Sequence, residues 1–153
     1  MKNFKNKVAA ITGAGSGIGQ QLALLLAQQG CHLALSDVNE QGLAQTLALL
    51  QDTPVRISTQ KLDVADREAM KQWAADTVTT HGSVNMIFNN AGVALSSTVE
   101  GTSYEELEWI VNINFWGVVY GTKEFLPLIK ATGDGHVINI SSLFGLTAQP
   151  TQS

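Results

Sequence analysis

A chain of 153 residues, 44% of them hydrophobic, can bury the core of one domain and does not have the composition of a disordered segment. The formal net charge of −4, without a basic block, argues against nucleic acid as the main partner. The sequence has one cysteine, Cys31, so it can form neither a disulfide framework nor a cysteine-rich metal site, and we interpret Cys31 as a core residue. No apolar run approaches the roughly 20 residues that span a membrane, and no signal-type segment follows the basic N-terminus. We therefore expect a soluble, cytoplasmic protein.

The first predicted strand, Val8–Ile11, leads into the glycine-rich residues 12–19 and then into a helix that ends before Gly30. A strand, a glycine turn and a helix in this order can hold phosphate. Glycine lets the backbone approach a ligand closely, and the free N–H groups of the helix attract anions. An ordinary glycine-rich connection is the alternative reading. The residues at helical spacing are Ile18, Leu22, Leu25, Leu26 and Gln29.

The second strand, Leu33–Asp37, is apolar and ends in a carboxylate. Asn39 can cap the helix that follows, and Pro54 lies after its end. Residues 55–62 alternate more than the other strands, as an exposed edge strand does. The apolar stripe of the helix consists of Leu43, Leu47 and Leu50.

A third helix starts after the capping residue Asp66 and ends at Gly82, and a fourth strand covers residues 84–88. Ser103 and Glu106 have the spacing of a capping box at the start of a long helical stretch. The inward residues of the third helix are expected to be Met70, Trp73, Ala74, Thr77 and Val78.

The long helical stretch runs from the capping box to about Thr132, and Pro127 should kink or loosen it. Residues 137–140 form a fifth strand, which Ser141 and Ser142 follow. Near its start, a single face of the helical stretch carries Leu107, Ile110, Val111 and Asn114, and further along it carries Val118, Thr122, Phe125, Leu126 and Ile129.

Five strands thus alternate with helices, which predicts an α/β fold with a doubly wound parallel sheet and helices on both faces. Ligands bind such sheets at the carboxyl ends of the strands. The residues just after the predicted strands are Gly13, Asp37, Asp63, Asn89, Asn90, Ser141 and Ser142.

Asp37 stands 18 residues after Gly19 at the end of the second strand. A carboxylate in this place can accept both hydroxyls of an adenosine ribose and repels a 2′-phosphate. Neither Ser16 nor Val38 supplies a cation for such a phosphate. We therefore expect NAD rather than NADP, with a helix-capping or solvated Asp37 as the alternative.

The glycine spacing is G-x-x-x-G-x-G, not the commoner G-x-G-x-x-G. Together with three later motifs it resembles the short-chain dehydrogenase/reductase family over nearly all of residues 7–148. The four motifs are Thr12–Gly19, Asn89–Gly92, Asn114–Gly117 and Ser141–Ser142.

The resemblance implies a Rossmann fold with strand order 3-2-1-4-5, in which residues 1–153 are one dinucleotide-binding domain. It implies that one of Asn89 and Asn90 is structural and that Asn90 is the one near the cofactor. Asp63 as a plain turn residue remains an alternative. The implied cofactor residues are Gly13, Gly15, Ser16, Gly17, Ile18, Gly19, Asp37, Asp63, Val64, Asn90, Ala91 and Gly92.

By the same resemblance Ser142 and Asn114 are catalytic. Ser142, rather than Ser141, would hydrogen-bond the substrate oxygen, and Asn114 would help to hold a water in a proton relay. The helical pattern places Asn114 in the core, where an amide must be hydrogen-bonded. A satisfied packing residue is the alternative for Asn114. No metal site is expected.

In the family, protons are handled by a Tyr-x-x-x-Lys pair beyond the serine, and this chain contains no such pair. We therefore expect the chain to belong to a longer protein, without its C-terminal strands and helices and not competent alone. The expected function is NAD-dependent hydride transfer with an alcohol or ketone, in a homodimer or homotetramer. The alternative is a non-catalytic dinucleotide-binding or scaffold protein.

Overall fold

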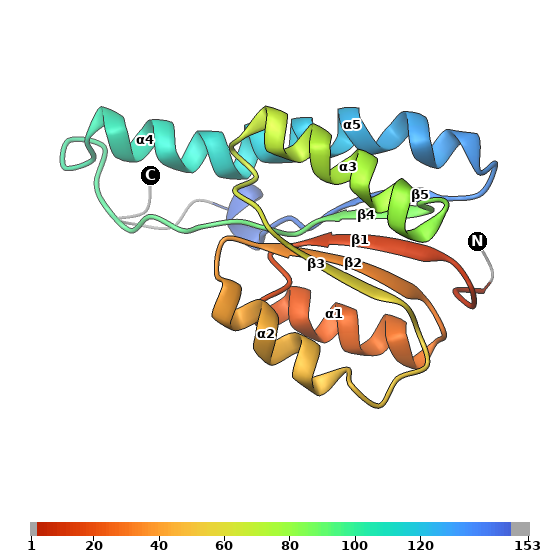
Figure 1. Ribbon diagram of the computed structural model, residues 1–153. Helices are drawn as coiled ribbons and strands as arrows, with labels where there is room; N and C mark the ends of the chain where they lie inside the picture. Colours follow the sequence, from red (N-terminus) through yellow and green to blue (C-terminus); the bar gives the residue numbers. More distant parts are fainter. Residues whose placement is uncertain (1–2, 148–153) are drawn as a thin grey trace.

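The computed structural model describes residues 3–147 and consists of a parallel sheet between two layers of helices (Figure 1). The sheet has five strands in the order β3-β2-β1-β4-β5, which confirms the predicted architecture. As expected, β3 is an edge strand, and β5 forms the opposite edge. The strands are β1 (Val8–Thr12), β2 (His32–Asp37), β3 (Ile57–Lys61), β4 (Met86–Asn89) and β5 (His136–Asn139).

Helices α1 and α2 cover one face of the sheet, and α3 and α5 cover the other (Figure 1). The helix α4 continues through the π-helix η1 into α5, so that one long helical element crosses the upper layer in Figure 1. The helices are α1 (Gly17–Gln28), α2 (Glu40–Leu49), α3 (Arg67–His81), α4 (Tyr104–Val111), η1 (Asn112–Trp116), α5 (Gly117–Ala131) and the 3-10 turn η2 (Leu143–Gly145).

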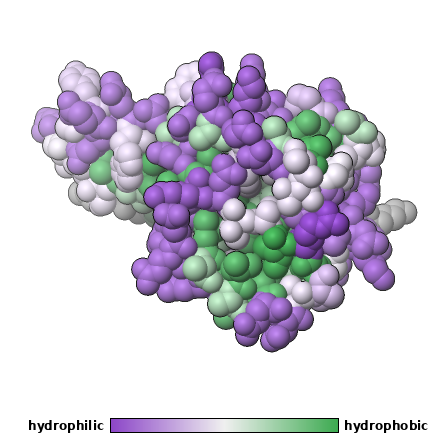
Figure 2. All heavy atoms as spheres, viewed as in Figure 1, coloured by the Kyte–Doolittle hydropathy of each residue, from purple (hydrophilic) through white to green (hydrophobic). Residues whose placement is uncertain are grey.

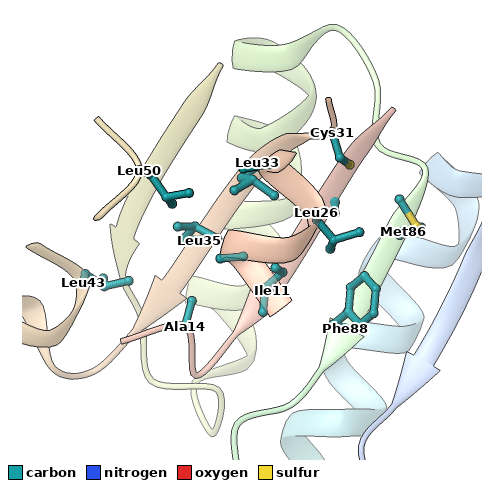
Figure 3. Packing of buried hydrophobic residues seen from close by; sticks show 13 residues of the cluster. Ile11, Ala14, Leu26, Cys31, Leu33, Leu35, Leu43, Leu50, Met86 and Phe88 are labelled. Carbon is teal, nitrogen blue, oxygen red and sulfur yellow. The ribbon is translucent and has the colours of Figure 1, made fainter. Parts of the chain in front are cut away.

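Each face of the sheet has its own core, because successive strand residues point to opposite faces. In β1, Ala9 and Ile11 join the cluster under α1, whereas Val8 and Ala10 join the cluster under α3 and α5. Figure 3 shows the first cluster, with Leu26 of α1 beside the sheet. The second cluster contains Trp73 and Phe125, whose rings meet edge to face with their centroids 5.0 Å apart. The predicted inward face of α3 is thereby confirmed.

The helix N-terminal caps that the sequence predicts are present. The Asn39 side chain accepts a hydrogen bond from the Gly42 N–H, and the Asp66 side chain accepts one from the Ala69 N–H. Ser103 and Glu106 form the reciprocal capping box. Each cap satisfies an N–H group that has no partner inside the helix.

The core position of Cys31 is confirmed. Its side chain is fully buried, and burial raises the pKa of the thiol from 9.0 to about 12. The thiol therefore stays protonated at neutral pH, and Cys31 is an unreactive core residue.

Two of the apolar residues at helical spacing in α1 lie outside the core. Ile18 is 62% exposed and Leu25 is 58% exposed. The residues of α1 that face the sheet are mostly small, with Leu26 as the one large residue among the buried ones. The buried residues of α1 are Gly19, Ala23, Leu26 and Ala27.

The predicted stripe of α2 is wrong at Leu47, which is 42% exposed, while Leu43 and Leu50 are buried. Figure 2 shows hydrophobic residues on the surface of the layer that α1 and α2 form. The spacing of apolar residues along a helix does not by itself separate the residues of the buried face from exposed apolar residues at the edge of that face.

Pro127 does not interrupt the long helix, since α5 continues through it to Ala131. Pro127 is exposed, and so is Lys123, whose carbonyl loses its hydrogen-bond donor and can be hydrated. The irregularity lies earlier, in η1, where a π-helical turn precedes α5. Helix α5 thus continues through Pro127, and the kink or loosening expected there stays a prediction.

Candidate functional site

A cavity of about 370 Å³ opens at the carboxyl edge of the sheet. The predicted cofactor residues line it, except Gly15 and Gly19. Its volume lies in the range of ligand pockets in proteins. The lining residues are Gly13, Ser16, Gly17, Ile18, Asp37, Val38, Leu62, Asp63, Val64, Asn90, Ala91, Gly92, Val93 and Ile113.

Two glycines of the loop have backbone angles that favour glycine, with φ of +65° at Gly13 and +51° at Gly17. A Cβ on Gly13 would lie 2.9 Å from the Cα of Ala91, so the loop lies directly against the end of β4. A Cβ on Gly17 would have no atom within 4 Å. Gly17 thus leaves open space at the start of α1, where the first N–H groups lack helical partners. A phosphate group fits such a place.

Gly15 and Gly19 do not line the cavity, but the fold needs both. A Cβ on Gly19 would overlap the Gly13 carbonyl oxygen, and one on Gly15 would lie 2.9 Å from an Asp37 carboxylate oxygen. These two glycines let α1 and β2 close around the loop. Their contacts are with protein, and the spacing motif alone could not separate them from Gly13 and Gly17.

The loop is fastened to β4 by hydrogen bonds in both directions. The Asn90 amide Nδ2 donates to the carbonyls of Thr12, at 2.9 Å, and Gly13, at 3.2 Å. The Thr12 hydroxyl accepts the backbone N–H groups of Asn90, at 2.9 Å, and Ala91, at 3.0 Å. Sequence reasoning missed this role of Thr12, although a threonine at a strand end beside a glycine turn is a usable signal.

The two neighbouring asparagines have different surroundings. The Asn89 side chain is buried and donates to Thr122 Oγ1, at 3.2 Å, and Asn139 Oδ1, at 2.8 Å. These bonds join β4 to α5 and β5. Asn90 lines the cavity. Asn89 thus has a structural role, and a role of Asn90 near a cofactor stays a prediction.

Asp37 is held in one orientation at the wall of the cavity. Its Oδ2 accepts the Gly15 N–H and its Oδ1 accepts the Asn39 N–H, each at 2.9 Å. A carboxylate has about four acceptor positions, so both oxygens can still accept a ligand hydroxyl. Asp63 has a looser setting, in which Oδ1 accepts only the Ala65 N–H, at 2.9 Å. Within residues 3–147, the cavity lining contains no Arg, Lys or His.

Asn114 is exposed, and its predicted core position is wrong. It lies in η1, and α4 before it contains no buried residue, because nothing in residues 3–147 covers the outer side of α4. The Asn114 amide is nevertheless satisfied: Oδ1 accepts the Val93 N–H at 2.9 Å, and Nδ2 donates to the Val93 carbonyl at 2.8 Å. Asn114 therefore holds a cavity residue without lining the cavity.

Ser142 follows β5 and caps η2, where its Oγ accepts the Phe144 N–H at 3.2 Å. Like Ser141 it is exposed, and it does not line the cavity. The Ile140 N–H donates to the Asn89 carbonyl at 2.9 Å, so the chain that leads to Ser142 lies beside the end of β4. The structure therefore brings Ser142 to the same edge of the sheet as the cavity.

Four lining residues were not predicted. They are apolar, and the sequence reasoning considered only the first of them, as a position without a cation: Val38, Leu62, Val93 and Ile113. Nothing in their sequence separates such residues from ordinary core residues. Among residues 3–147, no group of three or more His, Cys, Asp or Glu is arranged to hold a metal ion. No helix in that range combines the length and the apolar character needed to cross a membrane.

The family model described as short chain dehydrogenase matches residues 7–153, so the chain belongs to this family. Its individual relatives agree. SadH of Mycobacterium tuberculosis (strain ATCC 25618 / H37Rv) is 50% identical over 153 residues, which are 100% of this chain and 55% of SadH. Cyclohexanol dehydrogenase of Acinetobacter sp. (strain SE19) is 38% identical over 145 residues, which are 94% of this chain and 57% of that enzyme.

Among solved structures, a short-chain dehydrogenase/reductase from Burkholderia phymatum in complex with NAD matches with a TM-score of 0.95 and 33% sequence identity. The match covers 99% of this chain and 54% of that protein. The chain thus spans little more than half the length of the relatives that it matches.

Proposed function

We propose that residues 1–153 form the dinucleotide-binding domain of an NAD-dependent oxidoreductase, which transfers a hydride between nicotinamide and an alcohol or ketone. The observation that carries the choice of NAD is the Asp37 carboxylate, fixed by two backbone N–H groups in a cavity whose described lining holds no cation. Such a carboxylate favours ribose hydroxyls and disfavours a 2′-phosphate. Membership in the family and the NAD complex of the Burkholderia relative support the proposal.

The residues present fit such a ligand. The start of α1, with open space at Gly17, would hold the pyrophosphate, and Asp37 would hold the adenosine ribose. Asp63 and Val64 would border the adenine, and Asn90, Ala91 and Gly92 the nicotinamide end. When bound, the nicotinamide supplies or accepts the hydride.

The role proposed for Ser142 follows from its hydrogen bonding. Its Oγ accepts the Phe144 N–H, which leaves the hydroxyl proton for a substrate oxygen. Asn114 would keep Val93 and the adjoining chain in place beside the reacting groups. The relatives are nearly twice as long, and we propose that the Tyr and Lys of proton transfer belong to that further length.

Assembly and location belong to the same proposal. The long helical element exposes apolar residues that could pair with a second copy in a homodimer or homotetramer. The single buried thiol requires no oxidising compartment, and we propose a cytoplasmic location. The exposed apolar residues are Leu107, Trp109, Val111, Phe115 and Trp116.

The test is separate titration of the purified protein with NADH and NADPH, followed by nicotinamide absorbance with a panel of alcohols and ketones. We expect NADH to bind more tightly than NADPH and at least one substrate to be turned over. Equal or tighter NADPH binding would refute the role of Asp37. Binding without turnover, also in the protein extended to the length of its relatives, would favour a non-catalytic dinucleotide-binding or scaffold protein.

A further inference from the structure

The rear of the glycine loop rests on α2, at a contact that no motif marks. A Cβ on Gly42 would lie 2.8 Å from the Gly15 carbonyl oxygen, so the loop and the first turn of α2 meet backbone to backbone. Thr46 stands one helical turn further on and is completely buried. Residues four apart lie on the same face of a helix, so Thr46 faces the loop as Gly42 does.

The Thr46 hydroxyl is the centre of a short chain of hydrogen bonds. It donates to the Ala14 carbonyl at 2.9 Å, and it accepts Nε2 of Gln20 in α1, also at 2.9 Å. The direction is fixed, because a carbonyl oxygen can only accept. The Gln20 amide thus orients the hydroxyl toward the loop.

The Ala14 carbonyl and the Gly15 N–H belong to one planar peptide unit. Thr46 holds the carbonyl end of this unit, and Oδ2 of Asp37 accepts the N–H end at 2.9 Å. If the carbonyl loses its donor, the peptide can rotate, and rotation moves the N–H that orients the carboxylate. Thr46 is therefore coupled to Asp37 through a single rigid plane.

We propose that Thr46 is a positioning residue for dinucleotide selectivity, acting on the Asp37 carboxylate through the Ala14–Gly15 peptide. The inference rests on the proposed function of Asp37. It assigns to a buried threonine of α2, outside the cavity lining, a share of the preference for a ribose without a 2′-phosphate. Preorganisation of this kind improves binding by lowering the ordering cost.

The test is the substitution Thr46→Val, which keeps the shape of the side chain and removes the hydroxyl. Loss of one hydrogen bond to a buried carbonyl predicts roughly tenfold weaker NADH binding. NADPH binding should change by less than about twofold, because the repulsion by Asp37 is relaxed at the same time. The ratio of the two dissociation constants should therefore move toward one, and Thr46→Ser should restore it.

A matched control is Thr77→Val. Thr77 is also a buried helical threonine whose hydroxyl donates to a backbone carbonyl, that of Trp73, but it lies in α3 on the other face of the sheet. The Thr77→Val substitution should lower stability without changing the ratio of the NADH and NADPH dissociation constants. A shift by Thr77→Val equal to that by Thr46→Val would overturn the inference.

A double-mutant cycle separates coupling from general damage. In an Asp37→Ser background, Thr46→Val should change the NADH to NADPH ratio no further. If Thr46→Val leaves the ratio unchanged in the wild-type background, the role of Thr46 is refuted while the proposed function stands. If the wild-type protein binds no dinucleotide, both are refuted.

A second variant keeps the test decisive if Thr46→Val does not fold. Gln20→Met removes only the amide that orients the Thr46 hydroxyl and leaves the Ala14 contact available. It should move the ratio in the same direction by about twofold to threefold. An unchanged ratio in folded Gln20→Met protein would count against the inference.

Discussion

Replacement of Asp37 by serine should shift the choice of dinucleotide away from NADH. The carboxylate has acceptor positions left for two ribose hydroxyls after its bonds to Gly15 and Asn39. A net value of about 1.5 kcal/mol for each hydrogen bond to a charged group gives about 3 kcal/mol in total. At about 1.4 kcal/mol per tenfold change, NADH binding should weaken roughly a hundredfold.

NADPH should behave differently, because Asp37→Ser also removes the negative charge that would face the 2′-phosphate. We expect its dissociation constant to stay within about threefold of the wild-type value or to fall. The assay is nicotinamide fluorescence on binding, at fixed ionic strength, because screening changes the charge effect. Urea unfolding in parallel reports the cost of freeing the two backbone N–H groups.

The matched control is Asp63→Ser. Asp63 lines the same cavity, so the substitution removes the same charge, but its carboxylate accepts only the Ala65 N–H. It should weaken NADH and NADPH by similar, small factors. An unchanged NADH to NADPH ratio in Asp37→Ser, or an equal change in Asp63→Ser, would refute the assignment.

Three further perturbations test other regions of the structure. Burial, and to a lesser extent the nearby charges, lower the pKa of His81 from 6.5 to about 4, so protonation favours the unfolded chain. Urea titrations should therefore show that the free energy of unfolding decreases as the pH is lowered from about 6.5 to 4, by at most about 1.4 kcal/mol per pH unit. Gly19→Ala should lower it by about 1–3 kcal/mol at neutral pH, because the Cβ would overlap the Gly13 carbonyl. Asn114→Ala should weaken NADH binding about tenfold in a fluorescence titration, because the Val93 backbone loses both partners.

Each of these has its own control. His81→Gln should flatten the acid end of the stability profile; a slope that persists would assign it to carboxylates instead. Gly133→Ala places a methyl group in open space, so it should cost only the roughly 1–2 kcal/mol of a left-handed alanine. Asn114→Gln keeps both the acceptor and the donor of the amide and should lose less affinity than Asn114→Ala.

Local rules account for the features of the fold that the sequence predicts well. The caps at Asn39, Asp66 and Ser103 depend on residues within one helical turn, and the structure contains all of them. The alternation of strands and helices predicts the parallel sheet, because such connections pack only in a few ways. The glycine spacing and Asp37 mark the cavity in advance, since both are fixed by chain geometry at the ends of β1 and β2.

The order of the elements, their caps and the polar residues at the carboxyl ends of the strands can all be derived from the sequence alone. The three-dimensional packing is needed to tell the glycines that face the cavity from those that let α1 and β2 pack against the loop. The packing also leaves Asn114 exposed and brings the Thr46 hydroxyl of α2 to the Ala14 carbonyl. The physical reason is that burial and long-range hydrogen bonds depend on what packs opposite a residue, and a one-dimensional pattern carries no information about that neighbour.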